Sequence, residues 1–469
     1  MTARQRLVVI GNGMAGFKFC EKFVRYRLQK KFDLVVLGEE EQPAYDRVNL
    51  TRYLTHGEDR ILAPASWYTQ QGIQLRTGDK VWRIQREKKC VETASGAIVP
   101  YDRLILATGS TVYMPPVEGI SLPGVLPYRT LHDLRVIRAH MKECKRAIVI
   151  GGGLLGLEAA KAMLDGGMET VIIERAGQLM PRQLDPGAAS MLLEQVKASG
   201  LHVFLNKEIS GISQVDGELR MSCWDGDVIG ADMIVCSAGI VPRDELGRAT
   251  GLAIGTRGGI VVNNHMVTSD PSIYAIGECA LAHGKIWGLA VPCYEMAEVL
   301  AARLSGIYKV FRGDLLFTQL KVLGTKLAHI AAVDDEQEEG EHIVLEKKEE
   351  GIYKRIDLSA DGKRIRNVIL LGDVSDYASL LQMVRMRTHP PPDPAILLNG
   401  TGSSDHRVAS LSDATVICLC QSVNKGALAQ AITRDGLQRI DQVCRATGAG
   451  TGCETCHALI EEMINYYAP

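Results

Sequence analysis

Residues 7–16 read LVVIGNGMAG, a run of branched apolar side chains that ends in a Gly-x-Gly-x-x-Gly turn. A second apolar run, LVVL at 34–37, follows a helix-like stretch, and Glu39 comes shortly after it. In such a turn the backbone can approach a pyrophosphate and the amides at the start of the helix point at it, while the acid accepts hydrogen bonds from a ribose. The pattern therefore predicts a parallel, doubly wound sheet that binds a dinucleotide.

The same pattern occurs again at residues 147–156, which read AIVIGGGLLG and precede another strand at 171–173 and then Glu174. One glycine-rich turn on its own is a weak signal, because a turn without a ligand can have the same composition. Here each of two turns lies between a strand and a helix, and an acid follows about 20 residues later. The repetition predicts two dinucleotide-binding domains.

The bulk composition limits the kind of protein. A chain of 469 residues is long enough for two or three domains, and 46% apolar with 23% charged residues is ordinary for a globular protein. Because 53 Lys and Arg face 55 Asp and Glu, no strong overall field favours nucleic acid or an anionic membrane as a partner. The first apolar run is too short for a signal peptide, and no run of about 18 apolar residues predicts a membrane span. We therefore expect a cytoplasmic protein.

The C-terminal third of the sequence changes character. Short alternating strands, as at 352–358 and 368–371, are typical of an antiparallel α+β unit. Residues 388–415 are rich in Pro, Gly, Ser and Asp and predict a linker. Residues 416–469 end in an amphipathic stretch at 458–466 and predict a small helical appendage, which is short enough to need a staple.

Two further segments carry a family resemblance. Residues 104–109 read LILATG and residues 268–278 read TSDPSIYAIGE, and together they resemble the paired signatures of the glutathione-reductase-like flavoproteins. The resemblance implies that the first glycine turn binds FAD and the second binds the nicotinamide cofactor. It also implies that Glu278, where the family usually has Asp, holds the ribityl chain of the flavin. Taken alone, the two segments would also fit a buried strand end and a surface acid.

Two acids of the second nucleotide motif bear on the nicotinamide cofactor. A carboxylate at the strand end, Glu174, binds a free 2′-hydroxyl and repels a 2′-phosphate, so NADH is favoured over NADPH. Arg175 follows it and could accommodate a phosphate, which weakens that preference. Glu158 matches the acid that many members of the family place near the nicotinamide ring, although a helix-surface glutamate explains it equally well.

The sequence predicts no dithiol beside the flavin. Disulfide reductases of this superfamily carry a C-x4-C pair or a single cysteine just after the first nucleotide motif, and residues 40–54 contain no cysteine. A dithiol relay is therefore excluded. Cys279 and Cys293 flank segments expected near the flavin, but isolated cysteines are usually small core residues, and we assign them no chemistry.

Four of the twelve cysteines form two close pairs near the C-terminus, C-x-C at 418–420 and C-x-x-C at 453–456. Four thiolates suit a [2Fe-2S] cluster, and they suit a structural zinc ion equally well. The predicted flavin favours the cluster, because a one-electron carrier is the natural acceptor from a cofactor that receives a hydride. The glycine-rich run at 446–452 could aim backbone amides at the sulfur atoms, and Cys444 is expected to be a packed thiol.

Several stretches along the chain carry a closer resemblance. They are IGNGM at 10–14, AYDRV at 44–48, GGGLLGLEAA at 151–160, YAIGECA at 274–280, KG at 425–426 and TGAGTGC at 447–453. With these stretches the whole chain resembles the flavoprotein half of the large subunit of assimilatory NAD(P)H nitrite reductase. Its tail resembles the bacterioferritin-associated-ferredoxin-like [2Fe-2S] domain of that family.

One departure from that family concerns its catalytic region. The nitrite reductase subunit continues into a sirohaem and [4Fe-4S] region, whereas no further cysteine follows Cys456 here. We therefore do not expect nitrite reduction on this polypeptide. A shorter relative, the electron-transfer subunit of assimilatory nitrate reductase, has the same parts and serves a separate molybdenum subunit, and the length fits it better.

The expected fold is α/β, with two doubly wound dinucleotide-binding domains, a small α+β domain and a C-terminal helical [2Fe-2S] domain. The expected boundaries are 1–112 with 268–312 for FAD, 113–267 for NAD(P)H, 313–387 for the α+β interface domain, 388–415 for the linker and 416–469 for the cluster domain. The expected cofactor-binding residues are Gly11, Gly13, Met14, Ala15, Gly16, Glu39, Arg47, Thr108, Gly109, Gly277, Glu278, Gly151, Gly153, Leu155, Gly156, Glu158, Glu174 and Gly239. The expected cluster ligands are Cys418, Cys420, Cys453 and Cys456.

The expected mechanism needs no catalytic side chain. NADH gives hydride to FAD, single electrons pass to the cluster, and the cluster presents them to a catalytic partner, a molybdenum nitrate reductase or a sirohaem nitrite reductase. Two other functions remain open. One is a general reductase of ferredoxin-type acceptors, and the other is a redox sensor or assembly module that holds zinc and has no turnover.

Overall fold

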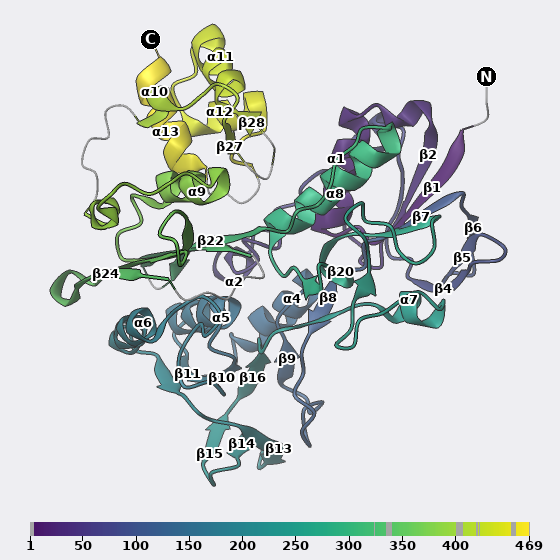
Figure 1. The fold of residues 1–469 in the computed structure, drawn as a ribbon. Helices are drawn as coiled ribbons and strands as arrows, with labels where there is room; N and C mark the ends of the chain where they lie inside the picture. The colour runs from purple at the N-terminus through teal and green to yellow at the C-terminus, as the bar shows by residue number, and fades with distance from the viewer. Residues whose placement is uncertain are drawn as a thin grey trace. The chain divides into compact units, whose positions relative to one another are not determined.

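The computed structural model describes residues 4–322, 324–333, 340–399, 407–418, 421, 423–451 and 456–468. The chain divides into two compact units, each made of two stretches of sequence (Figure 1). The first unit comprises residues 1–112 and 240–313, and the second comprises 113–239 and 314–469. The chain thus leaves the first unit and returns to it later.

The first unit is built on a five-stranded parallel sheet with strand order β19-β7-β1-β2-β3. Its strands are β1 (Gln5–Ile10), β2 (Phe32–Leu37), β3 (Gln74–Arg76), β7 (Arg103–Leu106) and β19 (Ile273–Ala275). The central strand β1 pairs in parallel with β2 and β7. Leu7, Val8 and Val9 have no exposed surface, as expected for a parallel strand covered on both faces. The apolar run quoted from residues 7–10 is therefore the centre of the core.

Two long helices of this unit pack against each other, α1 (Met14–Arg25) and α8 (Ala290–Ser305) (Figure 1). A buried ion pair joins them, with 2.6 Å between Lys22 Nζ and Glu298 Oε2. The Tyr26 hydroxyl donates a second hydrogen bond to the same carboxylate. Burial of Glu298 opposes its ionisation, but Lys22 and Tyr26 lower its pKa to about 2. The C-terminal end of the helix that begins at the first glycine turn is thereby fixed to α8.

Smaller elements complete the first unit. They are β4 (Val81–Gln85), β5 (Cys90–Thr93), β6 (Ile98–Pro100), β8 (Ser110–Val112), β17 (Ile240–Pro242), β18 (Ile260–Val261), β20 (Ala280–Ala282), β21 (Lys285–Ile286), α2 (Arg52–His56), α3 (Ala65–Gln70) and α7 (Glu245–Ala249). The returning strand β17 pairs antiparallel with the leaving strand β8. For that reason the compact unit takes the chain back at 240, earlier than the expected boundary at 268.

The second unit contains a parallel sheet of the same kind, with strand order β12-β11-β10-β16-β9. Its strands are β9 (Val125–Pro127), β10 (Arg146–Ile150), β11 (Glu169–Ile173), β12 (His202–Phe204) and β16 (Met233–Cys236), and its helices are α4 (Leu131–His140), α5 (Leu154–Asp165) and α6 (Pro186–Ala198). An antiparallel sheet of β13 (Ile209–Val215), β14 (Glu218–Cys223) and β15 (Val228–Ala231) extends from it (Figure 1). The strand that precedes the glycine turn again lies between the strands that follow it.

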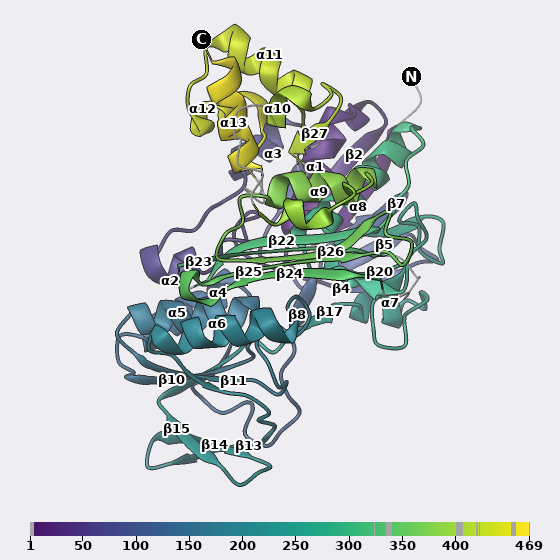
Figure 2. The same ribbon diagram turned by 60° about the vertical axis from the view of Figure 1, so that its left-hand side comes forward.

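A five-stranded antiparallel sheet follows, with strand order β22-β23-β26-β25-β24. Its elements are β22 (Leu315–Val322), β23 (Thr325–Ala332), β24 (His342–Lys347), β25 (Ile352–Leu358), β26 (Ile365–Leu371) and α9 (Tyr377–Met386). Figure 2 shows α9 lying along this sheet. The strand predicted at 352–358 is β25, and the strand predicted at 368–371 lies within β26.

The C-terminal segment is a small helical bundle with a two-stranded sheet, which confirms the predicted helical appendage. Its elements are α10 (Arg407–Ser410), β27 (Val416–Cys418), β28 (Val423–Asn424), α11 (Lys425–Asp435), α12 (Ile440–Thr447) and α13 (His457–Tyr467). Leu428, Ile432, Val443, Ile460 and Met463 are fully buried and form its core. The stretch predicted as a linker carries a short 3-10 helix, Pro394–Leu397, and α10 among its described residues.

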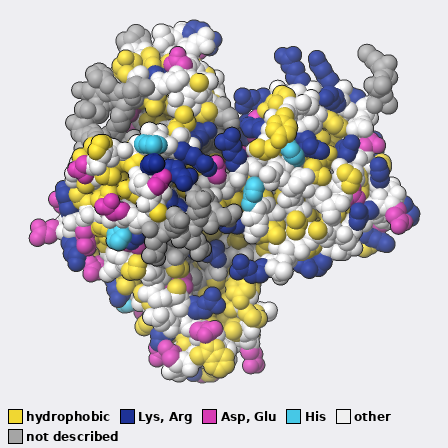
Figure 3. Space-filling model, in the orientation of Figure 1, with side chains coloured by type: hydrophobic (Ala, Val, Ile, Leu, Met, Phe, Trp, Pro, Cys, Tyr) yellow, Lys and Arg dark blue, Asp and Glu magenta, His cyan; other side chains and the backbone are white. Residues whose placement is uncertain are grey.

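Two surface properties bear on the expected partners. No helix among the described residues is long and apolar enough to cross a bilayer. On the face drawn in Figure 3, Lys and Arg side chains and Asp and Glu side chains both occur over much of the surface, in keeping with a net charge of -2.

Candidate functional site

The first glycine turn owes its shape to its first and third glycines. Gly11 has a φ of +109°, which side chains rarely adopt, and a Cβ there would overlap the Ala107 carbonyl oxygen. A Cβ on Gly16 would overlap the Gly11 carbonyl oxygen, so helix α1 can approach β1 only without a side chain there. These two glycines are required by the fold itself.

The middle glycine has another role. Gly13 has an ordinary extended conformation, with φ −86° and ψ −165°, and a Cβ on it would meet no atom within 4 Å. Helix α1 begins at Met14, and no side chain caps the amides of its first turn, which includes Ala15. An open space in front of uncapped helix amides fits a pyrophosphate, because the amides and the helix dipole both favour an anion.

The second glycine turn repeats this geometry. Gly151 has a φ of +113°, and a Cβ on it would lie 2.5 Å from the Ser237 carbonyl oxygen. A Cβ on Gly156 would overlap the Gly151 carbonyl oxygen, whereas Gly153 again faces open space at the start of α5, whose first turn contains Leu155. The second unit therefore offers a second pyrophosphate cradle of the same kind.

The acid after the second turn is held by main-chain amides. Glu174 follows β11, its Oε2 accepts a hydrogen bond from the Gly152 N–H at 2.7 Å, and its Oε1 accepts one from the Ala176 N–H at 2.7 Å. The carboxylate is thereby fixed beside the glycine turn with lone pairs to spare for ribose hydroxyls. Arg175 next to it is exposed.

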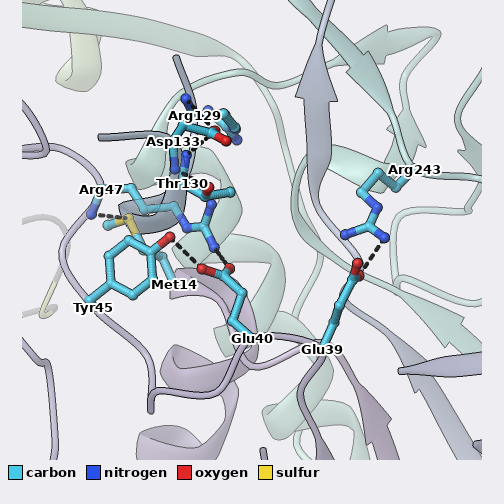
Figure 4. A network of polar contacts seen from close by, with 9 residues as sticks. All are labelled: Met14, Glu39, Glu40, Tyr45, Arg47, Arg129, Thr130, Asp133 and Arg243. Atoms are coloured by element: carbon cyan, nitrogen blue, oxygen red, sulfur yellow. Dashed lines mark hydrogen bonds and ion pairs between the residues drawn. The ribbon is translucent and has the colours of Figure 1, made fainter. Parts of the chain in front are cut away.

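The acid after the first turn is held by cations instead. Glu39 Oε2 lies 2.5 Å from Arg243 Nη2 (Figure 4). Glu39 Oε1 lies 3.5 Å from Lys80 Nζ. Partial burial opposes ionisation of Glu39, but Arg243 and Lys80 together bring its pKa below the usual value. Arg243 is 204 positions away in the sequence, and no motif pointed to it.

The neighbouring acid, Glu40, holds the predicted site residue Arg47. The Arg47 guanidinium donates to Glu40 Oε1, and the Tyr45 hydroxyl donates to Glu40 Oε2 at 2.7 Å (Figure 4). The guanidinium also lies 4.6 Å from the centre of the Tyr45 ring. Burial opposes the charge of Arg47, but Tyr45, Glu40 and Glu278 raise its pKa. No sequence motif pointed to Glu40, although it directly follows Glu39.

The two signature segments approach the same end of the first sheet. The backbone N–H of Arg47 donates to Met14 Sδ in the first turn of α1. Gly277 has a φ of +80°, and a Cβ on it would lie 2.9 Å from the Ala15 side chain. Glu278 follows it and accepts a hydrogen bond from Ser110 Oγ at 2.7 Å. The glycine turn and the second signature thus form one neighbourhood.

Thr108 and Gly109 lie at the carboxyl end of β7. The Thr108 hydroxyl donates to the Arg243 carbonyl oxygen at 2.6 Å, and Gly109 has a φ of +70° with no atom near a Cβ position. In the second unit, Gly239 has a φ of +118° and also faces open space. Glu158 is half-buried on α5.

Cys279 and Cys293 are packed core residues, as expected. The Cys279 thiol is fully buried and donates to the Leu106 carbonyl oxygen, and burial raises its pKa. The Cys293 thiol donates to the Trp287 carbonyl oxygen. A raised pKa makes a thiolate scarce, so Cys279 is a poor nucleophile at neutral pH.

Two of the four expected cluster ligands are described, and both are buried. Cys418 ends β27 with no exposed surface, and Cys456 precedes α13 with 4% exposure. Cys420 and Cys453 lie outside the described residues, and among the described residues no three His, Cys, Asp or Glu side chains form a metal-ligand group. The two cysteine segments nevertheless meet, since Gln421 Nε2 donates to Thr451 Oγ1 at 3.0 Å. That contact fits four thiolates around one centre.

The glycine-rich run before Cys453 packs against the start of α13. Gly450 has a φ of +78°, and its carbonyl oxygen lies 2.9 Å from His457 Nε2. A Cβ on Gly450 would lie 2.8 Å from both Cys444 Sγ and His457 Nε2. The glycine is therefore needed for the fold of this loop, and Cys444 is packed against it.

Three family models match the chain. Residues 5–297 match the pyridine nucleotide-disulphide oxidoreductase family, residues 317–388 match the rubredoxin NAD+ reductase C-terminal domain, and residues 416–465 match the BFD-like [2Fe-2S] binding domain. These matches confirm the predicted fold class, the flavin and nicotinamide cofactors and the C-terminal [2Fe-2S] domain.

Two curated relatives are similar to nearly the whole of this chain. The chain is 41% identical to a nitrite reductase [NAD(P)H] large subunit of Klebsiella oxytoca, over 98% of this chain and 49% of that protein. It is 34% identical to the assimilatory nitrate reductase electron transfer subunit of Bacillus subtilis, over 99% of this chain and 60% of that protein. The chain thus spans about half the length of the curated relatives it matches, and the family resemblance predicted from the motifs is confirmed.

Among solved structures, a ferredoxin reductase from Rhodopseudomonas palustris is similar, with a TM-score of 0.75 and 26% identity. The similarity covers 83% of this chain and 96% of that one.

Proposed function

The chain belongs to the pyridine nucleotide-disulphide oxidoreductase family, and from that premise we propose that it feeds electrons from NAD(P)H to a nitrate or nitrite reductase catalytic partner. The observation that carries this proposal is the presence, on one chain, of two pyrophosphate cradles and a BFD-like [2Fe-2S] binding domain. FAD accepts the electron pair of a hydride, and a [2Fe-2S] cluster carries one electron at a time.

The residues of the first unit would hold FAD. The Gly13 opening and the first turn of α1 would receive the pyrophosphate, Glu39 the adenosine ribose, and Glu278 the ribityl chain. Arg47 would add a positive charge, and its orientation is set by Glu40 and Tyr45. The full set is Gly11, Gly13, Met14, Ala15, Gly16, Glu39, Arg47, Thr108, Gly109, Gly277 and Glu278.

The residues of the second unit would hold the nicotinamide cofactor. Gly153 leaves room for the pyrophosphate, and the fixed Glu174 carboxylate would accept the ribose hydroxyls and repel a 2′-phosphate. NADH is therefore the proposed donor. The full set is Gly151, Gly153, Leu155, Gly156, Glu158, Glu174 and Gly239. No side chain has to act as a nucleophile or a general base, so these residues contribute position and electrostatics.

Cys418, Cys420, Cys453 and Cys456 would bind the cluster. The burial of Cys418 and Cys456 supports this assignment, because exclusion of water protects and tunes such a centre. The contact between Gln421 and Thr451 supports it as well, because it joins the two cysteine segments.

For the catalytic partner, nitrate is our first choice of substrate and nitrite our second. Relatives with either role cover the whole of this chain, the nitrite reductase large subunit in Klebsiella oxytoca and the nitrate reductase electron transfer subunit in Bacillus subtilis. The partner would carry a molybdenum or a sirohaem centre.

A direct test combines composition and turnover. The purified 469-residue polypeptide should contain FAD and iron, be reduced by NADH, and pass electrons to ferricyanide or a viologen dye. Nitrate or nitrite reduction should appear only after a molybdenum or sirohaem subunit is added. Stoichiometric zinc without iron after anaerobic purification, or steady nitrite or nitrate turnover by the polypeptide alone, would refute the proposal.

A second candidate function is reduction of a separate ferredoxin-type or rubredoxin-type acceptor. The match of residues 317–388 to the rubredoxin reductase C-terminal domain and the similarity to a ferredoxin reductase favour it. The two candidates differ in what accepts the electrons. Fast NADH-driven reduction of a small iron-sulfur protein, undiminished by Cys453→Ser, would favour the second candidate, because the chain's own cluster would then be dispensable.

A further inference from the structure

Arg243 stands at the point where the chain returns to the first unit. Its backbone N–H donates to the Gly109 carbonyl oxygen at 2.9 Å, and its carbonyl oxygen accepts a hydrogen bond from the Thr108 hydroxyl at 2.6 Å. It follows directly on β17, which pairs with β8. Both sides of the Arg243 backbone are thereby fixed to the Ala-Thr-Gly turn at the end of β7.

The side chain of Arg243 reaches a different strand end. Its Nη2 lies 2.5 Å from the Oε2 atom of Glu39, which follows the C-terminal end of β2 in the chain (Figure 4). The Arg243 side chain is 31% exposed and that of Glu39 is 42% exposed. The other partner of Glu39 is Lys80, which is farther away at 3.5 Å and 54% exposed. Arg243 is therefore the better-placed partner of this carboxylate.

A carboxylate has more accepting positions than Arg243 uses. The two oxygens of Glu39 offer about four lone-pair directions, and Arg243 occupies one of them on Oε2. Among the described residues, the cation beside Oε1 is Lys80, whose ammonium lies 3.5 Å away on a side chain that is 54% exposed. A fixed Oε2 leaves Oε1 oriented and available for a ribose hydroxyl.

We infer that Arg243 is a positioning residue for FAD, which holds the Glu39 carboxylate in the orientation that accepts the adenosine ribose. This inference rests on the proposed FAD site of the first unit. Arg243 also offsets the charge of Glu39 near a ligand that carries two phosphate charges. Without it, Lys80 would be the remaining cation beside Glu39 among the described residues, at 3.5 Å and with a side chain that is 54% exposed.

The ionisation of Glu39 agrees with this role. Partial burial opposes the charge of Glu39, and the hydrogen bond and charge of Arg243 overcome that opposition and lower the pKa. A carboxylate that stays ionised is an acceptor on both oxygens, as ribose binding requires.

The test measures FAD affinity directly, on protein from which the flavin has been removed. Arg243→Met should raise the Kd for FAD at least two-fold and up to roughly five-fold, the size expected for a partly exposed charged pair. The increase should shrink as salt is added, because exposed charges are screened. Arg243→Lys keeps the positive charge but lacks the planar guanidinium, so its Kd for FAD should lie between those of the parent protein and Arg243→Met. Arg248→Met is the matched control, because Arg248 pairs with Asp244 on the adjoining helix and does not contact Glu39.

A second variant separates positioning from a merely structural role. Glu39→Gln should weaken FAD binding by itself, and adding Arg243→Met to it should weaken binding little further, because Arg243 acts through Glu39. Circular dichroism and the thermal midpoint of the flavin-free protein show whether each variant folds, and Arg243→Lys replaces Arg243→Met in the cycle if the latter does not.

Two outcomes overturn the inference. One is an FAD Kd for Arg243→Met within two-fold of the parent value in folded protein, and the other is additive effects of the two substitutions. Failure of the proposed function looks different, because the parent protein itself would then bind no FAD.

Discussion

Gly153→Ala and Gly156→Ala, at the second and third glycines of the second glycine turn, each add one methyl group but should affect different properties. We expect the first to weaken cofactor binding and the second to lower stability. Gly153 has φ −80° and ψ −178°, which any residue adopts, and no atom lies within 4 Å of a Cβ position there. Gly156 lies in the first turn of α5, and its Cβ would overlap the Gly151 carbonyl oxygen. Because that oxygen belongs to the backbone, neither group can rotate away.

The sizes of the two effects follow from this geometry. Gly156→Ala overpacks the contact between helix and strand, which typically costs about 1–3 kcal/mol of stability. Because the second unit is larger than 250 residues, each kcal/mol lowers its thermal midpoint by roughly 2 °C. Gly153→Ala should leave stability unchanged but place its methyl group where the pyrophosphate would lie. An overpacking cost of about 1–3 kcal/mol would then weaken only the binding of the cofactor, and it corresponds to a loss of affinity of roughly 5- to 150-fold.

The assay is NADH-dependent ferricyanide reduction, together with flavin absorbance and thermal melting followed by circular dichroism. For Gly153→Ala we expect a normal flavin content, a melting curve like that of the parent, and a large loss in kcat/KM for NADH. Gly13→Ala is the matched control in the first unit, and it should lower flavin content rather than affinity for NADH. A folded Gly153→Ala protein that oxidises NADH with the parent kcat/KM would contradict the argument that this glycine makes room for the cofactor.

Three further expectations can be tested independently. Glu174→Ala should narrow the preference for NADH over NADPH, a difference of about 1–3 kcal/mol, and equal kcat/KM for both cofactors in the parent would show that Arg175 compensates. Cys453→Ser should abolish the iron-sulfur absorbance and the EPR signal of the reduced protein while FAD remains bound and reducible by NADH; retention of a full EPR signal would exclude Cys453 as a ligand. Burial opposes ionisation of Glu298, but Lys22 and Tyr26 hold its pKa at about 2, so its stabilisation is present above about pH 4.5 and is lost as the pH falls toward 2. Glu298→Gln should therefore flatten the pH dependence of urea unfolding in that range, and an unchanged slope would show that other acids dominate it.

The parts of the fold that sequence could predict are those fixed by neighbouring residues. The strand at 7–10, the turn at 11–16 and the following helix are coupled within one short segment, so their spacing alone specifies the geometry. The same holds for residues 147–156. The close cysteine pairs predicted a metal-binding tail for the same reason, and the match to a BFD-like [2Fe-2S] binding domain bears this out.

The parts that could not be predicted depend on distant segments. Arg243 meets Glu39 only because the three-residue strand β17 pairs with β8, and a strand that short gives no periodic signal. That pairing lies within the compact unit that takes the chain back at 240. Glu40 could not be predicted for another reason. It orients the Arg47 guanidinium, and that contact forms only in the folded chain, where Arg47 donates to Glu40.

The two glycine turns are nearly the same in local geometry, so the assignment of a different cofactor to each cannot come from the turns themselves. What differs is the neighbourhood. In the first unit, the segment beginning at Gly277 packs against Ala15 at the start of α1, and it carries Glu278 to that end of the sheet. In the second unit, the acid Glu174 is held by two backbone amides, that of Gly152 in the glycine turn and that of Ala176, two residues after Glu174. The Glu174 carboxylate is therefore oriented by main-chain groups, which cannot change rotamer. The Glu39 carboxylate of the first unit depends instead on the side chain of Arg243, which directly follows β17, so its orientation is set only once β17 has paired with β8.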